Sequence, residues 1–416
     1  MKYFLSLFLL SVMVLTSCSL DQCEQTITYT KNTAIYTDLD LLRVDDLVES
    51  PRAIDLPGKI YVSEELLIIG DRGTGIHLID NTDPSNPTSL SFLNVPGSTQ
   101  LYVEGDYIYS NAFYDMIKID ISDMNNIRIV DRMIEAFPID FRNAENHVLS
   151  GFTTEQVTEV ANCDDQFFDG GTFFFDDRDA LLDESAIPTS FISNGSTIGS
   201  ANRIATVDES MFIINRLQIF SFDIADDQIS EHKAYNFSEY IGWQMETIFA
   251  QDERLFIGSQ NGMSIHRLTT SNIQWVGEYF HERACDPVLP IEDGIAYLTL
   301  RSGNECPGVN INSLNVLDIS NTRNPFLIQE IEMTSPFGLS LIGDLLYVGE
   351  GDNGLRVFDA SNRSALSEIS YNRDISAFDI IAHPTRPDVV LLASEQGLAQ
   401  YDVEGDRFDV LSRILF

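Results

Sequence analysis

Short apolar segments that end in aspartate recur along the chain at intervals of about 40 residues. The clearest copies are GIHLID, MIKID, LQIFSFD, SLNVLD, GLRVFD and GLAQYD, which end at Asp80, Asp120, Asp223, Asp318, Asp359 and Asp402. GMSIHR, residues 262–267, fits the same frame with Arg267 in place of aspartate. The ends of successive segments are 40, 103, 44, 51, 41 and 43 positions apart. The spacing of 103 positions is longer than two ordinary intervals of about 40. We therefore expect a degenerate repeat near residues 136–165, followed by an insertion.

Each repeat contains further strands around this segment. About ten residues upstream lies a second run rich in Ile, Val, Leu and Tyr, and its copies are LLIIGD, DYIYSN, MFIINR, RLFIGS, GIAYLT, LLYVGE and VVLLAS. These residue types favour β-strands. Downstream come turn residues such as NTDPSNP and DISNTRNP, in which Asp and Asn side chains bond nearby backbone N–H groups and Pro presets φ. We therefore interpret the six repeated aspartates as structural turn caps at strand ends.

Strand, hairpin, strand, turn and strand together make one four-stranded antiparallel blade. A single blade cannot bury both of its faces, so such blades stack radially and close into a ring. The sequence therefore predicts an all-β fold, a β-propeller of seven or eight four-stranded blades. A β-sandwich with a coincidental spacing is the alternative.

The repeated strand and its turn resemble the LVIVD repeat, whose pattern is roughly Leu-x-Ile/Val-Val-Asp-x-Ser-x-Pro-x-x-Pro. The best copies are IHLIDNTDPSNP, residues 76–87, and LNVLDISNTRNP, residues 314–325. PGKIYV, IGWQMETIF (241–249) and CDPVLPIEDGIAYLTLRSGNEC (285–306) resemble segments of LVIVD-repeat lipoproteins of the Bacteroidota. The resemblance covers roughly residues 40–416 and implies a propeller. The family has no well-defined activity.

The N-terminus carries the features of a targeting signal. Residues 1–17, MKYFLSLFLLSVMVLTS, combine one lysine with an apolar run too short to span a bilayer and with small residues at the end. LTSC at the end of this run resembles the bacterial lipobox, which implies that Cys18 is lipidated; an ordinary signal with a chance cysteine is the alternative. We expect residues 18–42 to form a tether and residues 43–416 the propeller. The expected location is the outer membrane or cell surface, or else its periplasmic face, with membrane contact only through the lipid.

The charge and the cysteines limit the partners and the compartment. The chain has 64 acidic and 25 basic residues, a net charge of −39, which repels phosphate backbones and argues against nucleic acid. Four cysteines remain after the lipobox, and an exported protein usually pairs an even number. Cys285 and Cys306 bracket two predicted strands and are expected to form a disulfide; Cys23 with Cys163 follows by elimination. Four cysteines can pair in three ways, and the sequence alone leaves all three open.

Residues 164–200 interrupt the repeats and are expected to form a long acidic loop. Asp165, Asp169 and Asp176 fall at positions 1, 5 and 12 of a calcium-loop template, but Phe167 occupies position 3. A solvated loop is therefore favoured over a calcium site. We expect no metal and no cofactor.

The sequence carries no strong signature of a known catalytic site, since SxxK at residues 230–233 is expected by chance. It has no GxSxG, no GxxxxGK[ST] and no GxGxxG after a predicted strand, and HERAC lacks the second histidine of HExxH. His77 and His266 hold matching places in two repeats, which favours a packing role. The main hypothesis is a monomeric, membrane-anchored, outward-facing, non-catalytic binding or interaction scaffold for a protein or glycan of the cell envelope. The alternative is a hydrolase or lyase whose site is built from loops of several blades.

Overall fold

The computed structural model describes residues 24–137, 142–143, 145–162, 173–175, 203–215, 218–225, 228–236, 245–269, 272–282, 284, 288–302, 311–405 and 407–416. The chain divides into two compact units. The smaller unit comprises residues 1–37 and 141–187, and the larger unit residues 38–140 and 188–416.

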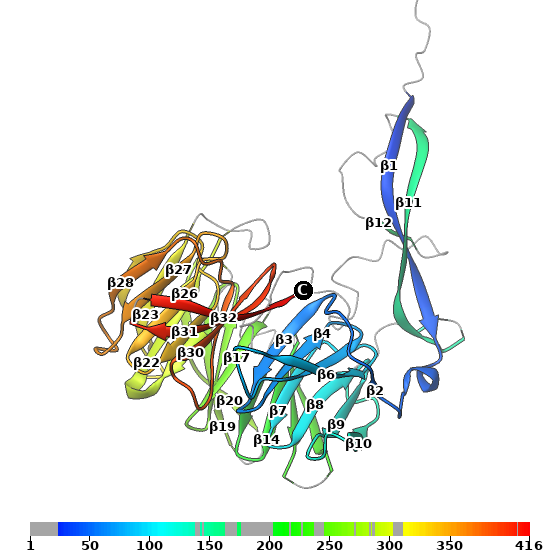
Figure 1. The fold of residues 1–416 in the computed structure, drawn as a ribbon, viewed down its shortest axis with the longest axis horizontal. Coiled ribbons are helices and arrows are strands. Elements are labelled where there is room, and N and C mark those ends of the chain that lie inside the picture. Colours follow the sequence, from blue (N-terminus) through cyan, green and yellow to red (C-terminus); the bar gives the residue numbers. More distant parts are fainter. Residues whose placement is uncertain are drawn as a thin grey trace, which may run out of the picture. The chain divides into compact units, whose positions relative to one another are not determined.

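The described part of the larger unit contains seven antiparallel sheets, here called blades 1 to 7 (Figure 1). Blade 1 contains β3 (Pro57–Val62), β4 (Leu66–Asp71), β5 (Gly75–Asp80), β6 (Thr88–Asn94) and the short outer strand β2 (Val48–Glu49). Blade 2 contains β7 (Leu101–Glu104), β8 (Tyr107–Ala112), β9 (Asp115–Asp120) and β10 (Arg128–Met133); blade 3 contains β13 (Ile204–Val207), β14 (Ser210–Ile214), β15 (Gln218–Asp223) and β16 (Ser230–Asn236). Blade 4 contains β17 (Met245–Gln251), β18 (Arg254–Ser259), β19 (Gly262–Leu268) and β20 (Ile273–Phe280).

The remaining blades repeat the same order. Blade 5 contains β21 (Val288–Ile291), β22 (Ile295–Leu300), β23 (Ser313–Asp318) and β24 (Phe326–Glu332). Blade 6 contains β25 (Leu339–Ile342), β26 (Leu345–Gly349), β27 (Leu355–Asp359) and β28 (Ser367–Asn372), and blade 7 contains β29 (Asp379–Ala382), β30 (Val389–Ser394), β31 (Gly397–Glu404) and β32 (Arg407–Leu415). Short 3-10 helices, η1 (Leu39–Leu42) and η3 (Glu292–Gly294), lie before blade 1 and inside blade 5.

The predicted strands occupy constant places in these blades. All seven repeated segments form the third strand, and all seven upstream runs form the second strand. A register shift between the third and fourth strands recurs in every blade, as between Leu78 and Ile79 in blade 1. Such bulges increase the local right-handed twist, which a propeller blade requires. The predicted propeller is confirmed, with seven blades.

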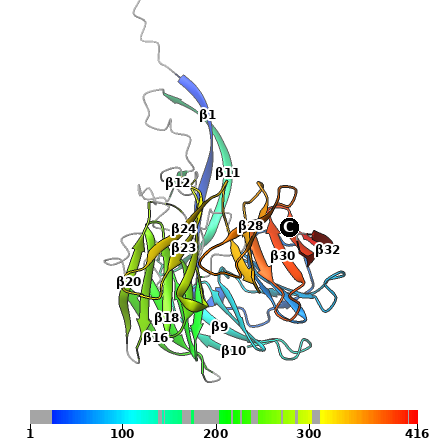
Figure 2. The same cartoon turned by 90° about the vertical axis from the view of Figure 1, so that its left-hand side faces the viewer.

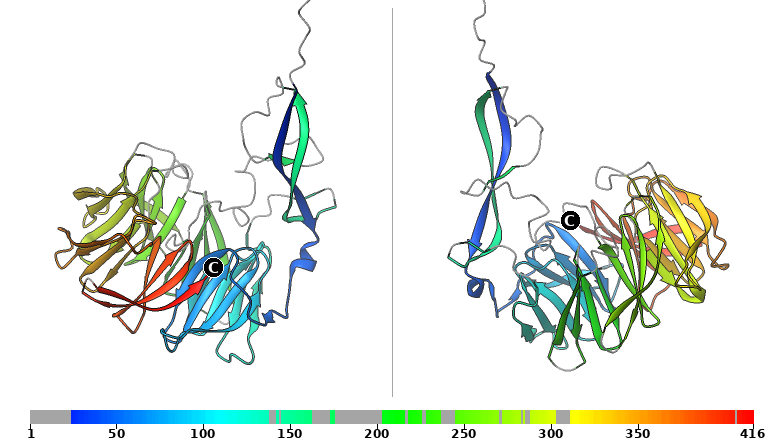
Figure 3. Two further views of the ribbon diagram at one scale, coloured as in Figure 1. Left: turned by 45° about the horizontal axis from the view of Figure 1, so that its top comes forward. Right: turned by 180° about the vertical axis from the view of Figure 1, so that it is seen from behind.

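Seven hydrophobic clusters lie between neighbouring blades and hold the ring together. The cluster that closes the ring packs Leu67 and Ile69 of blade 1 with Val389, Leu391 and Leu398 of blade 7. Figure 3 shows the red strands of blade 7 next to the blue strands of blade 1. Because each blade buries both faces against its neighbours, the ring needs no long helices.

The smaller unit is built on a long two-stranded ribbon (Figure 2). β1 (Glu24–Thr37) pairs antiparallel with β11 (Val148–Asn162) along its whole length, and β12 (Phe173–Phe175) pairs parallel with β1. The expected degenerate repeat near residues 136–165 is therefore wrong, because β11 pairs with a strand from the N-terminal part of the chain. Part of the segment expected to be a tether forms β1.

Residues 1–17 and Cys18 lie outside the described residues. No helix in the described part of the chain is long and apolar enough to cross a membrane.

Candidate functional site

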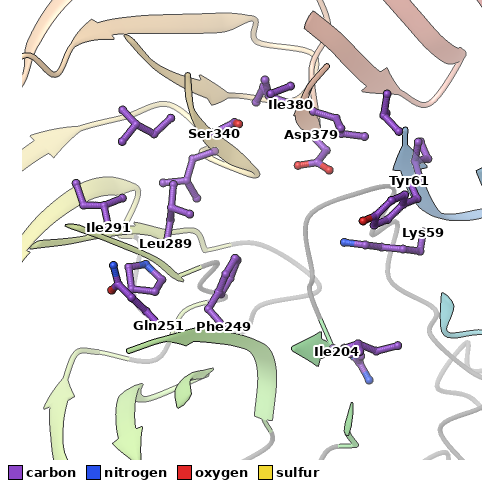
Figure 4. Close-up of a pocket in the computed structure, with 18 of the residues that line it drawn as sticks. Lys59, Tyr61, Ile204, Phe249, Gln251, Leu289, Ile291, Ser340, Asp379 and Ile380 are labelled. Carbon is purple, nitrogen blue, oxygen red and sulfur yellow. The ribbon is translucent and has the colours of Figure 1, made fainter. Parts of the chain in front are cut away.

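A cavity of about 710 Å³ lies at the centre of the seven-bladed unit (Figure 4). Residues of all seven first strands line it, from β3, β7, β13, β17, β21, β25 and β29 or the positions just before them. Since every blade repeats the same strand order, the first strands run in one direction and begin at the same end of the cavity. The position of a residue along its first strand therefore shows how far into the cavity it lies from that end.

Four polar side chains line the end at which the first strands begin. They belong to consecutive blades around the ring: Asp379 to blade 7, Lys59 to blade 1, Gln100 to blade 2 and Arg203 to blade 3. In Figure 4 the amine of Lys59 and the carboxylate of Asp379 point into the cavity. Burial lowers the pKa of Lys59, and the negative charge of Asp379 partly counteracts this shift. We call these four residues the polar arc.

Aromatic rings lie deeper along the same side. Tyr61 of β3 and Tyr102 of β7 meet edge to face with their ring centroids 6.5 Å apart. The hydroxyl of Tyr102 is 2.9 Å from the hydroxyl of Thr206 in β13. Burial raises the pKa of both tyrosines, so each ring presents a neutral hydroxyl at physiological pH.

Blades 4 to 6 present a mostly apolar wall. Phe249 comes from β17, Leu289 and Ile291 from β21, and Leu339 and Leu341 from β25. Gln251 and Ser340 are the polar side chains that these same strands add to the lining. The cavity is therefore amphipathic, with the polar arc on one side and an apolar wall on the other.

The end at which the first strands finish carries a second set of charges. Glu292 and Asp293 of η3 and Arg363, from the turn after β27, line the cavity there. The guanidinium of Arg363 is already engaged, because it lies 3.1 Å from a carboxylate oxygen of Asp344 and donates to the carbonyl of Ala360 at 2.6 Å. This arginine therefore orders the turn.

The lining allows ionic and hydrogen-bonding contacts with a ligand. No histidine is among the described residues that line the cavity, while the lining combines the polar arc, aromatic rings and aliphatic side chains. Among the described residues, no three His, Cys, Asp or Glu side chains gather closely enough to hold a metal ion.

The repeated aspartates lie away from this cavity, at the ends of third strands. Asp80 accepts hydrogen bonds from the backbone N–H of Thr82 at 2.9 Å and from its hydroxyl at 2.6 Å. Asp120, Asp223, Asp318 and Asp359 likewise accept from the backbone N–H two residues ahead. The hydroxyls of Thr82, Ser122 and Ser361, followed by the backbone N–H groups of the same residues, lower the pKa of Asp80, Asp120 and Asp359.

Asp402 differs from the other five repeated aspartates. Strand β31 continues past it to Glu404, and Asp402 lies opposite Asp409 of β32 inside the ladder. The physical reason is the tight hairpin around Gly405 (φ 68°), which replaces the longer turn of the other repeats. Asp402 is therefore a strand residue.

The two histidines in matching places are both buried. His77 Nε2 lies 3.1 Å from the carboxylate of Asp71, and His266 Nε2 lies 3.0 Å from the hydroxyl of Ser264. Burial lowers the pKa of His266 to about 4. Burial acts to raise the pKa of Asp71, but hydrogen bonds from His77 and from two backbone N–H groups outweigh it and lower the pKa. Both histidines thus lie inside blades, away from the cavity.

Several predicted site residues lie outside the described residues. They are Cys18, the four expected disulfide cysteines Cys23, Cys163, Cys285 and Cys306, and the weak calcium candidates Asp165, Asp169 and Asp176. The sequence analysis missed the polar arc. Its only local signal is PGKIYV, in which polar Lys59 and Tyr61 alternate with apolar Ile60 and Val62 in a strand at the centre of the ring.

Comparison with known proteins supports the repeat and the fold. Residues 308–332 and 338–372 match the model of the LVIVD repeat. The chain carries LVIVD repeats. No curated protein matches the sequence.

Solved structures resemble the whole fold at low sequence identity. The periplasmic gluconolactonase PpgL of Pseudomonas aeruginosa is 10% identical, with 84% of this chain and 96% of that chain covered and a TM-score of 0.54. The computationally designed protein Ika8 is 10% identical, with 88% and 89% covered and a TM-score of 0.51. Saccharomyces cerevisiae Sqt1 is 10% identical, with 92% and 87% covered and a TM-score of 0.50. At such identities the likeness concerns the fold alone.

Proposed function

We propose that this protein is a lipid-anchored, outward-facing binding scaffold whose ligand occupies the central cavity of the propeller. The observation that carries the proposal is the amphipathic lining of that cavity. Its volume of about 710 Å³ falls within the range of small-molecule sites, roughly 300–1,000 Å³. Such sites combine mostly apolar walls with a few placed polar groups. The ligand is therefore a small molecule or one end of a longer envelope component.

The rigidity of the ring supports a binding role. Each first strand belongs to a blade whose two faces pack in hydrophobic clusters, so the lining side chains sit on fixed elements. A preformed site spends little free energy on ordering when the ligand binds. The cavity can therefore bind a small ligand without a moving lid.

A ligand panel tests the cavity. Thermal shift with amino acids, mono- and disaccharides and short carboxylates is measured on the wild type, on Ser340→Trp, which fills the cavity from β25, and on Ser367→Trp, the matched change on exposed β28 of the same blade. Ligands should stabilise the wild type and Ser367→Trp but not Ser340→Trp, and mass spectrometry should recover them unchanged. Ser340→Leu replaces the Trp variant if the latter does not fold. Stabilisation that survives in the filled variant, or turnover of the ligand, would contradict the proposal.

The anchor has its own test. LTSC after an apolar run supports lipidation at Cys18, and each buried methylene of an acyl chain contributes about 0.8 kcal/mol to membrane binding. Cys18→Ala should lose metabolic lipid labelling and leave the membrane fraction. Protease accessibility on intact cells reports which side the propeller faces. If Cys18→Ala stays in the membrane fraction, lipid anchoring through Cys18 is contradicted.

A further inference from the structure

At the end where the first strands begin, the polar side chains that line the cavity come from one side of the ring. Asp379, Lys59, Gln100 and Arg203 come from four consecutive blades, whereas Phe249, Leu289, Ile291, Leu339 and Leu341 come from the three blades opposite. A ligand that lies near the polar arc therefore meets these four polar groups on one side and the apolar side chains of blades 4 to 6 on the other, while Glu292, Asp293 and Arg363 lie at the opposite end of the cavity. A molecule with a polar group at one end and an apolar body fits this division, because an unpaired polar group against an apolar wall is costly.

The polar arc combines two basic side chains with one acidic side chain. Arg203 carries a positive charge, and Lys59 adds a second one when it is protonated, against the single carboxylate of Asp379. With Lys59 protonated, the arc has a net charge of about +1 in a chain whose net charge is −39. Charge complementarity favours an anion here, since arginine and lysine both hydrogen-bond carboxylates and phosphates with charge assistance. The amide of Gln100, between the two cations around the ring, can donate to the same group.

Resting on the proposed function, we infer that the ligand is an organic anion with an apolar or aromatic body. Its anionic group is held by Lys59 and Arg203, and its body lies against Phe249 and the aliphatic side chains of blades 5 and 6. Tyr61 and Tyr102, which lie deeper on the same side as Lys59 and Gln100, contact the part of the ligand next to its anionic group.

Three probes with one body and different head groups test this inference by isothermal titration calorimetry at pH 7. They are 4-phenylbutyrate, 4-phenylbutanol and 4-phenylbutylamine. The carboxylate should bind the wild type about tenfold more tightly than the alcohol, because one charge-assisted hydrogen bond contributes about that factor. Lys59→Gln and Arg203→Gln should each reduce this preference, while the alcohol binds unchanged.

Controls separate this inference from the proposed function. Arg407→Gln removes a cation whose side chain is 68% exposed on β32, and it should leave all three affinities unchanged. If the alcohol or the amine binds as tightly as the carboxylate, or if none binds while the ligand panel finds other ligands, the inference is overturned and the binding cavity stands. If neither the probes nor the panel bind, the proposed function itself fails.

Discussion

Asn81 and Gln400 exchange two side-chain hydrogen bonds across the contact between blades 1 and 7. The Asn81 amide donates to Gln400 at 3.1 Å, and the Gln400 amide donates back at 2.6 Å. Both side chains are fully buried, and 319 positions separate them in the sequence. The pair therefore joins the two ends of the propeller inside its core.

Removing one member of this pair takes two hydrogen bonds from the buried amide that is left, although Gln400 still donates to the hydroxyl of Ser412 at 3.2 Å. Gln400→Ala and Asn81→Ala should each lower the free energy of unfolding by about 1–3 kcal/mol in urea denaturation. The double variant should cost about 1 kcal/mol less than the sum, because both changes remove the same interaction. Gln274→Ala, on exposed β20, is the control and should change stability by less than about 0.5 kcal/mol. Strict additivity of the two single effects would contradict the proposed coupling.

The turn aspartates should make stability depend on pH in the acid range. Their hydrogen bonds lower the pKa of Asp80, so its contribution is complete above the unfolded-state pKa of about 4 and is lost as pH falls through the folded-state value. Asp80→Asn should be less stable than the wild type at pH 7, and this difference should shrink below about pH 4. Melting temperatures from pH 7 to pH 2.5 measure it. A difference in melting temperature between the wild type and Asp80→Asn that stays constant from pH 7 to pH 2.5 would contradict this prediction.

Asp402→Asn provides the matched comparison for that series. Because Asp402 lies inside the β31–β32 ladder opposite Asp409, its replacement removes a pair of like charges and no turn cap. Like charges directly opposite one another destabilise a sheet. Asp402→Asn should therefore be at least as stable as the wild type at pH 7. A loss equal to that of Asp80→Asn would contradict the distinction.

The ribbon of the smaller unit leads to a disulfide prediction. The last described pair of its ladder is Glu24 opposite Asn162, and the neighbouring residues in the sequence are Cys23 and Cys163. A two-stranded ribbon is only marginally stable by itself, and a disulfide at its end would restrain it. Peptide mapping without reductant should recover Cys23 linked to Cys163, and Cys285 linked to Cys306. Free, alkylatable thiols or crossed pairs would refute these assignments.

Carboxylate binding in the cavity should decline at alkaline pH. Burial lowers the pKa of Lys59 below its ordinary value of 10.5, so the lysine loses its charge as pH rises through that lowered value. The affinity for 4-phenylbutyrate should fall over this range, while that for 4-phenylbutanol stays constant. The decline is assigned to Lys59 and not to Tyr61 or Tyr102, because burial raises the pKa values of both tyrosines.

Lys59→Arg is the control for that pH profile. The guanidinium keeps its charge throughout, so the decline should disappear in this variant. A wild-type affinity that stays flat up to pH 10.5, or a Lys59→Arg profile that still declines, would contradict the role of Lys59.

The sequence predicted the blades well because their signals are local. GIHLID is a short apolar run that ends in aspartate, and the same frame recurs in every blade, with Arg267 in place of the aspartate in blade 4, so strand type and order follow from short windows. The pairing of β1 with β11 has no such signal, because its register joins residues more than 110 positions apart. The same holds for the polar arc. Lys59 and Asp379 come together only because the ring closes, and PGKIYV, which contains Lys59, gives no indication of which residue it faces.

A crystal structure of the protein with 4-phenylbutyrate is the most direct test of the central claim that the cavity binds the ligand. The account predicts density for the probe inside the cavity, with its carboxylate nearest to Lys59 and Arg203 and its ring against Phe249. An empty cavity at a saturating probe concentration, or a probe bound elsewhere on the protein, would contradict it.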